Sequence, residues 1–116
     1  MGQSKDIKVS TRVPFQHIDA ANAETLISSG NIIILDVREA DSFERGHIDG
    51  AKNATIANLF NILDGVARDR SILVYCYHGY ASQEFGQLLS DFCYTNVYSL
   101  NGGYEAWINR ADTLAG

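Results

Sequence analysis

Short apolar runs alternate with segments of helical periodicity along most of the chain. Runs rich in β-branched residues predict strands at residues 15–18, 31–37, 51–54, 71–75 and 96–100. Apolar positions at helical spacing predict helices at residues 20–28, 40–44, 56–63, 81–92 and 103–110. Asp19 is the expected N-cap of the first helix. Strands separated by helices favour crossover connections, so the pattern predicts an α/β domain with a parallel sheet.

The length of the chain limits how many domains it can form. Its 116 residues, 46% of them hydrophobic, suffice for one core. We expect a flexible N-terminal segment over residues 1–12, one domain over residues 13–112 and a C-terminal tail over residues 113–116. Because such sheets bind ligands at the carboxyl ends of their strands, the functional residues are expected there.

The charge balance excludes some classes of partner. The net charge is -5, and the Lys and Arg residues are scattered, so we do not expect a nucleic-acid partner. The sequence has no apolar run of membrane-spanning length, and its start, MGQSKDIKVSTRV, lacks the apolar core of a secretory signal. We therefore expect no membrane partner and a cytoplasmic location.

Two cysteines are too few for a disulfide scaffold in a chain of this length. Neither lies in a CxxC pair or near enough histidine to predict zinc, so we expect no metal and a reducing compartment. Cys93 ends a helical pattern and is expected to be a small buried hydrophobic residue, with a role as a resolving thiol as the alternative.

The segment CYHGYAS, residues 76–82, places a thiol between a buried strand and a helix. Unpaired backbone N–H groups at the start of a helix hold anions and favour the ionised form of a thiol. Gly79 supplies the backbone freedom that such a curled loop needs. Cys76 is therefore a candidate nucleophile, and the alternative is a cysteine buried in the core at the end of its strand.

Three segments in this order, LDVREADSFERGHIDGAKNA, CYHGYAS and NGGYEAW, resemble the rhodanese family. The loop is most similar to the single-domain thiosulfate sulfurtransferases linked to glycerol 3-phosphate metabolism. The resemblance covers most of the chain from Leu35 to Trp107. It implies a rhodanese-like single domain with a five-stranded parallel sheet, helices on both faces, and a cysteine that cycles through a persulfide.

The expected reaction is a two-step displacement. Cys76 takes the outer sulfur of thiosulfate or a similar donor, sulfite leaves, and the persulfide passes its outer sulfur to cyanide or a thiol. This chemistry needs no cofactor. The physiological donor and acceptor stay open, with protein persulfides, thioredoxin and glutathione among the candidates, as does the oligomeric state.

The loop is expected to contact the substrate through its peptide N–H groups and some of its side chains. Ser82 either caps the following helix or directs its hydroxyl at the sulfur, and capping is the simpler interpretation. His78 either adds positive charge at the entrance or is merely solvated. The two tyrosines either line the mouth of the site or pack the loop against its neighbours. The predicted substrate-binding residues are Tyr77, His78, Gly79, Tyr80, Ala81 and Ser82.

Ala81 departs from the family pattern. Many rhodaneses have arginine five residues after the cysteine, and the glycerol-linked subgroup has serine there. A methyl group cannot hold an anion, so we expect thiosulfate to saturate the enzyme only weakly. Cysteine phosphatases and arsenate reductases of related fold need arginine six residues after the nucleophile, where this chain has Ser82, so that alternative is less favoured.

The other signature residues are expected to support the structure. Asp36 and Arg38 follow a predicted strand at the same edge of the sheet as the loop, which suggests an ion pair that anchors the connection, with Arg38 contacting substrate as the alternative. His47 is expected to bond backbone groups in a turn. Because one fold hosts many functions, a non-catalytic binding or sulfur-relay module stays open.

Overall fold

A computed structural model describes residues 12–111 of the chain, so most of the predicted flexible segment 1–12 and all of the predicted tail 113–116 lie outside the described residues. The strands are β1 (Gln16–Ile18), β2 (Ile32–Asp36), β3 (Lys52–Asn53), β4 (Ser71–Tyr75) and β5 (Asn96–Leu100). The helices are α2 (Ala20–Ser28), α3 (Ala40–Arg45), α4 (Leu59–Ile62), α5 (Ala81–Asp91) and α6 (Gly103–Ile108).

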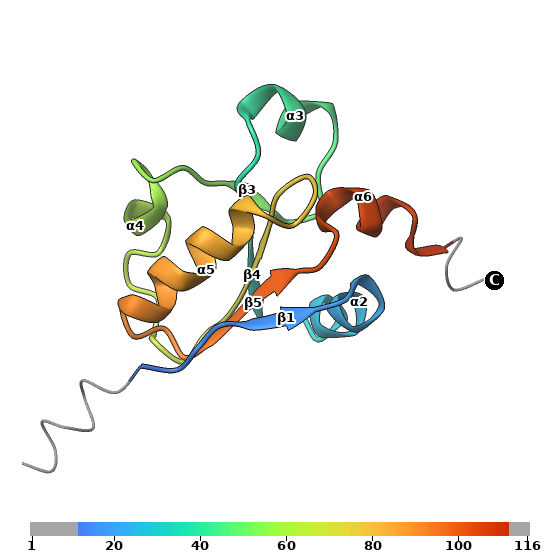
Figure 1. Ribbon diagram of the computed structural model, residues 1–116. Helices are drawn as coiled ribbons and strands as arrows, with labels where there is room; N and C mark the ends of the chain where they lie inside the picture. Colours follow the sequence, from blue (N-terminus) through green and yellow to red (C-terminus); the bar gives the residue numbers. More distant parts are fainter. Residues whose placement is uncertain (1–11, 112–116) are drawn as a thin grey trace, which may run out of the picture.

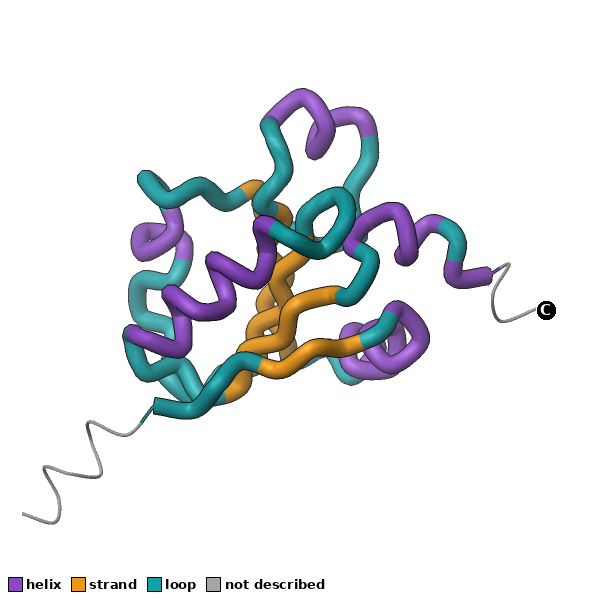
Figure 2. Tube along the Cα trace, in the orientation of Figure 1, coloured by secondary structure: helices purple, strands orange, loops and turns teal. Residues whose placement is uncertain are grey.

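The five strands form one parallel sheet in the order β1-β5-β4-β2-β3. Figures 1 and 2 show these strands together in the middle of the domain, with helices around them. This confirms the predicted α/β fold. β4 lies in the middle of the sheet, and its register sets Asp36 beside Tyr75 at the carboxyl end of the neighbouring strand β2. The turn after β4 therefore lies close to the turn after β2.

Helices cover both faces of the sheet (Figure 1). On one face α4 and α5 pack against a core that includes Leu35, Val74 and Leu89. On the other face, α2 and α6 pack against a second core, where Tyr104 and Trp107 of α6 lie against the buried residues. A central strand covered on both sides explains why β4 is apolar at almost every position.

One predicted helix is shorter than expected. The sequence predicts a helix over residues 56–63, but α4 is limited to Leu59–Ile62. The backbone N–H of Thr55 donates to Asn58 Oδ1 at 2.7 Å, and the N–H of Asn58 donates to Thr55 Oγ1 at 3.2 Å. These side-chain bonds close a turn over residues 55–58 and compete with the first helical turn.

The start of α2 is capped by the residue that the sequence predicts. Asp19 caps α2 as predicted, because its carboxylate accepts a hydrogen bond of 2.8 Å from the N–H of Asn22.

Cys93 follows α5 with φ 71° and is only partly buried, so the expectation of a small buried hydrophobic residue is wrong. The N–H of Cys93 donates to the carbonyl of Ser90, and the N–H of Tyr94 donates to the carbonyl of Leu89. This pair of hydrogen bonds is typical of a helix that ends with a residue in the left-handed conformation.

Candidate active site

The thiol of Cys76 lies just after the carboxyl end of β4, and two backbone N–H groups point at it. Its residue is 5% exposed. The N–H of Gly79 points at Sγ at 3.1 Å, and the N–H of Ser82, in the first turn of α5, does so at 3.4 Å. Two amide dipoles and the start of a helix thus converge on one sulfur atom, an arrangement that favours negative charge there.

The curl of the loop depends on its hydrogen bonds to α6. The carbonyl of Cys76 accepts from the N–H of Tyr104 at 2.8 Å, and the carbonyl of Tyr77 accepts from the N–H of Glu105 at 3.2 Å. Because α6 holds these carbonyls, they cannot turn toward the sulfur. The first turn of α6, which follows the NGG segment, therefore orients the loop so that amides face Sγ.

Two glycines allow this close approach. Gly79 has φ +100°, and a side chain there would come within 3.0 Å of the N atom of Gly102. Gly103 has φ +62°, and a Cβ atom there would strike the carbonyls of Cys76 and Tyr77. Both positions combine left-handed backbone with a lack of space, so glycine is needed for two reasons.

Ser82 does not cap α5, which corrects the simpler interpretation of this residue. The N-cap position is Tyr80, and no side chain forms a capping hydrogen bond there. Ser82 is instead fully buried, with its Oγ 3.6 Å from Cys76 Sγ and 2.8 Å from Ser99 Oγ. A buried hydroxyl therefore contacts the thiol in addition to the backbone amides.

Ser99 is a site residue that the sequence reasoning missed. It lies on β5, is 1% exposed, and contacts the thiol only through Ser82. A serine inside the apolar run NVYSL was the one available signal, because a buried hydroxyl needs a partner. That signal shows that a partner exists but not which residue it is.

The other loop side chains face outward. Tyr77 is 48% exposed and Tyr80 is 77% exposed. His78 lies with its Nδ1 3.1 Å from Glu105 Oε1, so it faces a carboxylate of α6 rather than the sulfur. Ala81 begins α5 and is exposed.

Asp36 and Arg38 form a buried ion pair where β2 leaves the sheet. Arg38 Nη2 lies 2.6 Å from Asp36 Oδ2 and also donates to the carbonyl of Gly46 at 2.7 Å. Burial alone would lower the pKa of Arg38, but the hydrogen bond to Asp36 and its negative charge together raise the pKa above the ordinary value. Asn53 binds the carbonyls of both residues and completes this anchor.

His47 follows Gly46, the residue that ends α3. Its Nδ1 is 2.8 Å from the carbonyl of Phe43, and its ring stacks on the Phe43 ring at a centroid distance of 3.8 Å. The residue therefore bonds a backbone group, in the manner that the sequence suggests.

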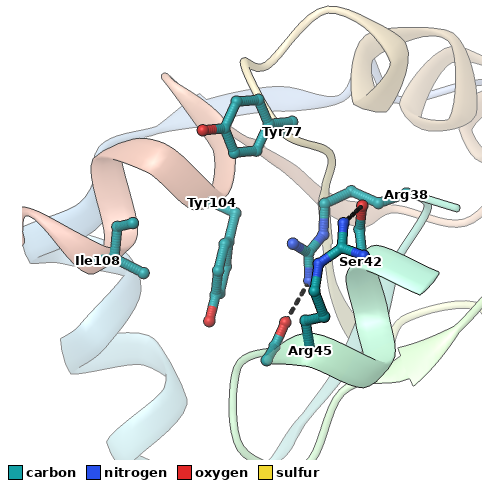
Figure 3. Close-up of a pocket in the computed structure, with 7 residues that line it drawn as sticks. Arg38, Ser42, Arg45, Tyr77, Tyr104 and Ile108 are labelled. Atoms are coloured by element: carbon teal, nitrogen blue, oxygen red, sulfur yellow. Dashed lines mark hydrogen bonds between the residues drawn. The ribbon is translucent and has the colours of Figure 1, made fainter. Parts of the chain in front are cut away.

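A pocket of about 410 Å³ adjoins the loop (Figure 3). Tyr77 of the loop and Tyr104 and Ile108 of α6 form one side, while Arg45 lies on the side of α3. Arg38 lies between them, with its guanidinium carbon 4.1 Å from the centroid of the Tyr104 ring. Cys76 itself does not line this pocket, so the pocket and the sulfur are neighbouring features.

Two kinds of feature are absent from residues 12–111. No group of three or more His, Cys, Asp or Glu side chains in this range has the arrangement of a metal site. None of the described helices is both long enough and apolar enough to span a membrane.

The fold and the site together define a class of protein: a parallel α/β domain, covered on both faces, with a cysteine-bearing loop at the carboxyl end of its central strand. A model of the rhodanese-like domain matches residues 19–110. The chain belongs to the rhodanese family.

Similar proteins agree with this assignment. The chain is 38% identical over 93 residues to "Thiosulfate sulfurtransferase GlpE" of Shewanella oneidensis, with 80% of this chain and 92% of the relative covered. The protein of the same name from Coxiella burnetii is also 38% identical, over 80% and 87% of the two chains. A rhodanese-related protein from Thermoplasma volcanium has a similar structure, with a TM-score of 0.70 and 29% identity over 83% of this chain and 93% of its own.

Proposed function

We propose that this protein is a thiosulfate sulfurtransferase that carries sulfur as a persulfide on Cys76. The observation that carries the proposal is the convergence of the Gly79 and Ser82 amides on Sγ, at 3.1 and 3.4 Å. The name of the 38% identical relatives, thiosulfate sulfurtransferase, supports the same reaction. The class of reaction is nucleophilic displacement at sulfur.

In the first step, the thiolate of Cys76 attacks the outer sulfur of thiosulfate. A new S–S bond forms to Sγ, the S–S bond of thiosulfate breaks, and its electron pair leaves on sulfite. One negative charge lies on the Cys76 thiolate before the step and on the outer sulfur of the persulfide after it. The amides of Gly79 and Ser82 are already oriented toward this charge, so they stabilise it without reorganisation. The Ser82 hydroxyl accepts from the neutral thiol and can turn its hydrogen to the thiolate.

In the second step, cyanide or a thiolate attacks the outer sulfur of the persulfide. The bond to Sγ breaks, and its electron pair returns to Cys76 as the thiolate. Tyr77 and Tyr80 of the loop are exposed, so acceptors of different sizes can reach this side of the loop, including a protein thiol such as that of thioredoxin. The two cysteines are not joined in a disulfide, which fits work in the reducing cytoplasm.

The persulfide is the intermediate that tests the proposal. Protein incubated with thiosulfate is expected to gain one sulfur atom by mass spectrometry and to lose it again on addition of cyanide. Cys76→Ser is expected to abolish the gain, because the nucleophile is absent. Cys93→Ser is the matched control and is expected to gain sulfur like the wild type.

A protein that takes up no sulfur from thiosulfate or from any other sulfane donor would instead be a binding module. Sulfur uptake that persists in Cys76→Ser and disappears in Cys93→Ser would show that Cys93 is the nucleophile. Either result would contradict the proposal.

A further inference from the structure

The pocket beside the loop has an uneven distribution of charge. Its lining residues are Arg38, Ser42, Arg45, Gly46, Tyr77, Tyr104 and Ile108, and we call it the Arg45 pocket. Two of these residues are cationic, and none of the described lining residues is acidic. A pocket with this lining favours a ligand that carries negative charge.

The two arginines differ in how far they are engaged. Arg38 is buried, paired with Asp36 and bonded to the carbonyl of Gly46, so its guanidinium is largely satisfied. Arg45 is exposed, and its Nη2 lies 3.4 Å from Ser42 Oγ, a long hydrogen bond (Figure 3). Among the ion pairs of the described residues, none includes Arg45. Arg45 is therefore the group that can receive an anion.

Two residues that line the Arg45 pocket are joined directly to Cys76, one by a peptide bond and one by a hydrogen bond. Tyr77 follows Cys76 directly, and the N–H of Tyr104 donates to the carbonyl of Cys76. The loop itself has no cationic side chain that could hold a substrate, because Ala81 carries only a methyl group and His78 faces Glu105. Positive charge for a substrate is thus supplied from α3, across the pocket.

The size of the pocket points to an organic ligand. Its volume of about 410 Å³ lies within the range of sites that hold small organic molecules, whereas the five atoms of thiosulfate would leave most of it empty. Tyr77, Tyr104 and Ile108 form a wall that suits a carbon chain. A ligand that fits both features has a short carbon skeleton with an anionic group at one end.

We propose that the Arg45 pocket binds the acceptor of the second step, a small organic thiol that carries a carboxylate, with the carboxylate on Arg45 and the carbon chain against Tyr77 and Tyr104. This inference rests on the proposed function, because it supplies the acceptor of that reaction. The thiolate of the ligand attacks the outer sulfur, the bond to Cys76 Sγ breaks with its electron pair on Sγ, and an organic persulfide leaves. Arg45 is then a specificity-determining residue.

The experiment compares acceptors that differ in charge. Protein loaded with sulfur from thiosulfate is mixed with 3-mercaptopropionate, which is anionic, or with 2-mercaptoethanol, which is neutral. Arg45→Ala is expected to raise KM for 3-mercaptopropionate roughly two- to fivefold, the effect of losing one charge-assisted contact at an exposed site. KM for 2-mercaptoethanol is expected to stay unchanged, so the differing reactivities of the two thiols cancel in the comparison of variant with wild type.

Two variants serve as controls. Arg45→Lys keeps the charge and is expected to restore most of the preference for the anionic thiol. Arg12→Ala removes another exposed arginine, one that lies 4.0 Å from Asp91 and does not line the pocket, and is expected to leave both KM values unchanged. Equal changes for the two thiols, or no change in Arg45→Ala, would overturn the proposal while leaving the persulfide chemistry intact.

A binding measurement separates this proposal from the proposed function. 3-(Methylthio)propanoate has the same carboxylate but no reactive thiol, and it is titrated into sulfur-free protein while NMR signals of Tyr77, Tyr104 and Ile108 are followed. Shifts of these signals that disappear in Arg45→Ala support the pocket even if no persulfide ever forms. An absence of shifts in the wild-type protein would overturn it.

Discussion

At the scale of single residues, the site consists of one nucleophile and a short series of hydroxyl groups. Ser99 Oγ lies 2.8 Å from Ser82 Oγ, which lies 3.6 Å from Cys76 Sγ. If Ser99 donates its hydrogen to Ser82, the hydrogen of Ser82 is directed at the sulfur. Ser99 then acts as a positioning residue, because it orients the hydroxyl that contacts the reacting atom.

This series predicts a specific effect of Ser99→Ala. Removal of the hydroxyl is expected to slow persulfide formation roughly three- to tenfold, because one hydrogen bond of about 1 kcal/mol no longer orients Ser82. Single-turnover mass spectrometry with thiosulfate measures this rate. Ser82→Ala combined with Ser99→Ala is expected to be no slower than Ser82→Ala alone, since Ser99 acts only through Ser82.

Ser90→Ala provides the matched control for that experiment. Ser90 is also a buried serine, but its hydroxyl donates to the carbonyl of Val13 at 2.6 Å, away from the thiol. Its removal is expected to lower stability without changing the rate. Additive effects of Ser82→Ala and Ser99→Ala would show that the two serines act separately.

Some residues of the site could be predicted from the sequence, and others could not. Cys76, Gly79 and the neighbouring amides could be predicted, because they follow one another in a segment whose local geometry is fixed by a strand, a glycine and a helix. Ser99 and Arg45 could not, because their roles depend on contacts between segments that are distant in the sequence. For Ser82 the sequence favours the simpler role, because serine is a preferred residue at the N-cap of a helix.

At the scale of elements, α6 fixes the shape of the catalytic loop. The N–H groups of Tyr104 and Glu105, in its first turn, donate to the carbonyls of Cys76 and Tyr77. At position 103, glycine is the only residue type that leaves room for these carbonyls. The sequence predicted this helix, over residues 103–110. The contact with the loop was not predictable, because it joins residues 76–77 to residues 103–105.

Gly103→Ala tests this connection between the helix and the loop. The methyl group would meet two carbonyls on a left-handed backbone, so unfolding by urea is expected to require roughly 3 kcal/mol less free energy than in the wild type. Persulfide formation is expected to slow as well, because the loop amides move away from Sγ.

Gly50→Ala is the comparison for backbone strain alone. Gly50 has φ +87° but no atom within 4 Å of the position of a Cβ, so its substitution is expected to cost roughly 1 kcal/mol and to leave the reaction rate unchanged. Equal losses of stability in the two variants would show that the carbonyl contacts do not matter.

At the scale of the whole molecule, the order of strands brings the functional groups to one edge of the sheet. β4 lies between β5 and β2, so Cys76 follows the central strand, Ser99 lies on one neighbour, and Asp36 ends the other. Periodicity predicted the strands and their parallel direction. It did not give their order, which depends on how the helices pack on both faces.

Tyr75 links this edge of the sheet to stability at alkaline pH. Its phenol is buried, accepts a hydrogen bond from the N–H of Ile48 at 3.0 Å, and has a pKa raised well above the ordinary value of about 10, first by burial and then by its hydrogen bond with Asp36. The folded state therefore keeps the proton at a pH where the unfolded chain releases it. The stability that depends on this proton is present below about pH 10 and is lost as the pH rises through the folded-state value.

The expected result is a steeper alkaline loss of stability in the wild type than in Tyr75→Phe. The free energy of unfolding of the wild type should fall by an additional 1.4 kcal/mol or so per pH unit above about pH 10, the linkage slope for one proton. Urea titrations of both proteins between pH 8 and about pH 11.5 measure it. Parallel pH profiles would show that Tyr75 titrates normally in the folded protein.

The hydrogen bonds from α6 to the loop have a consequence for protein synthesis. During translation Cys76 is synthesised before Tyr104 and Glu105, whose N–H groups bind the carbonyls of Cys76 and Tyr77. A nascent chain that stops short of Gly103 would expose an ordinary cysteine, and its reactivity toward sulfur would begin only when the last helix docks.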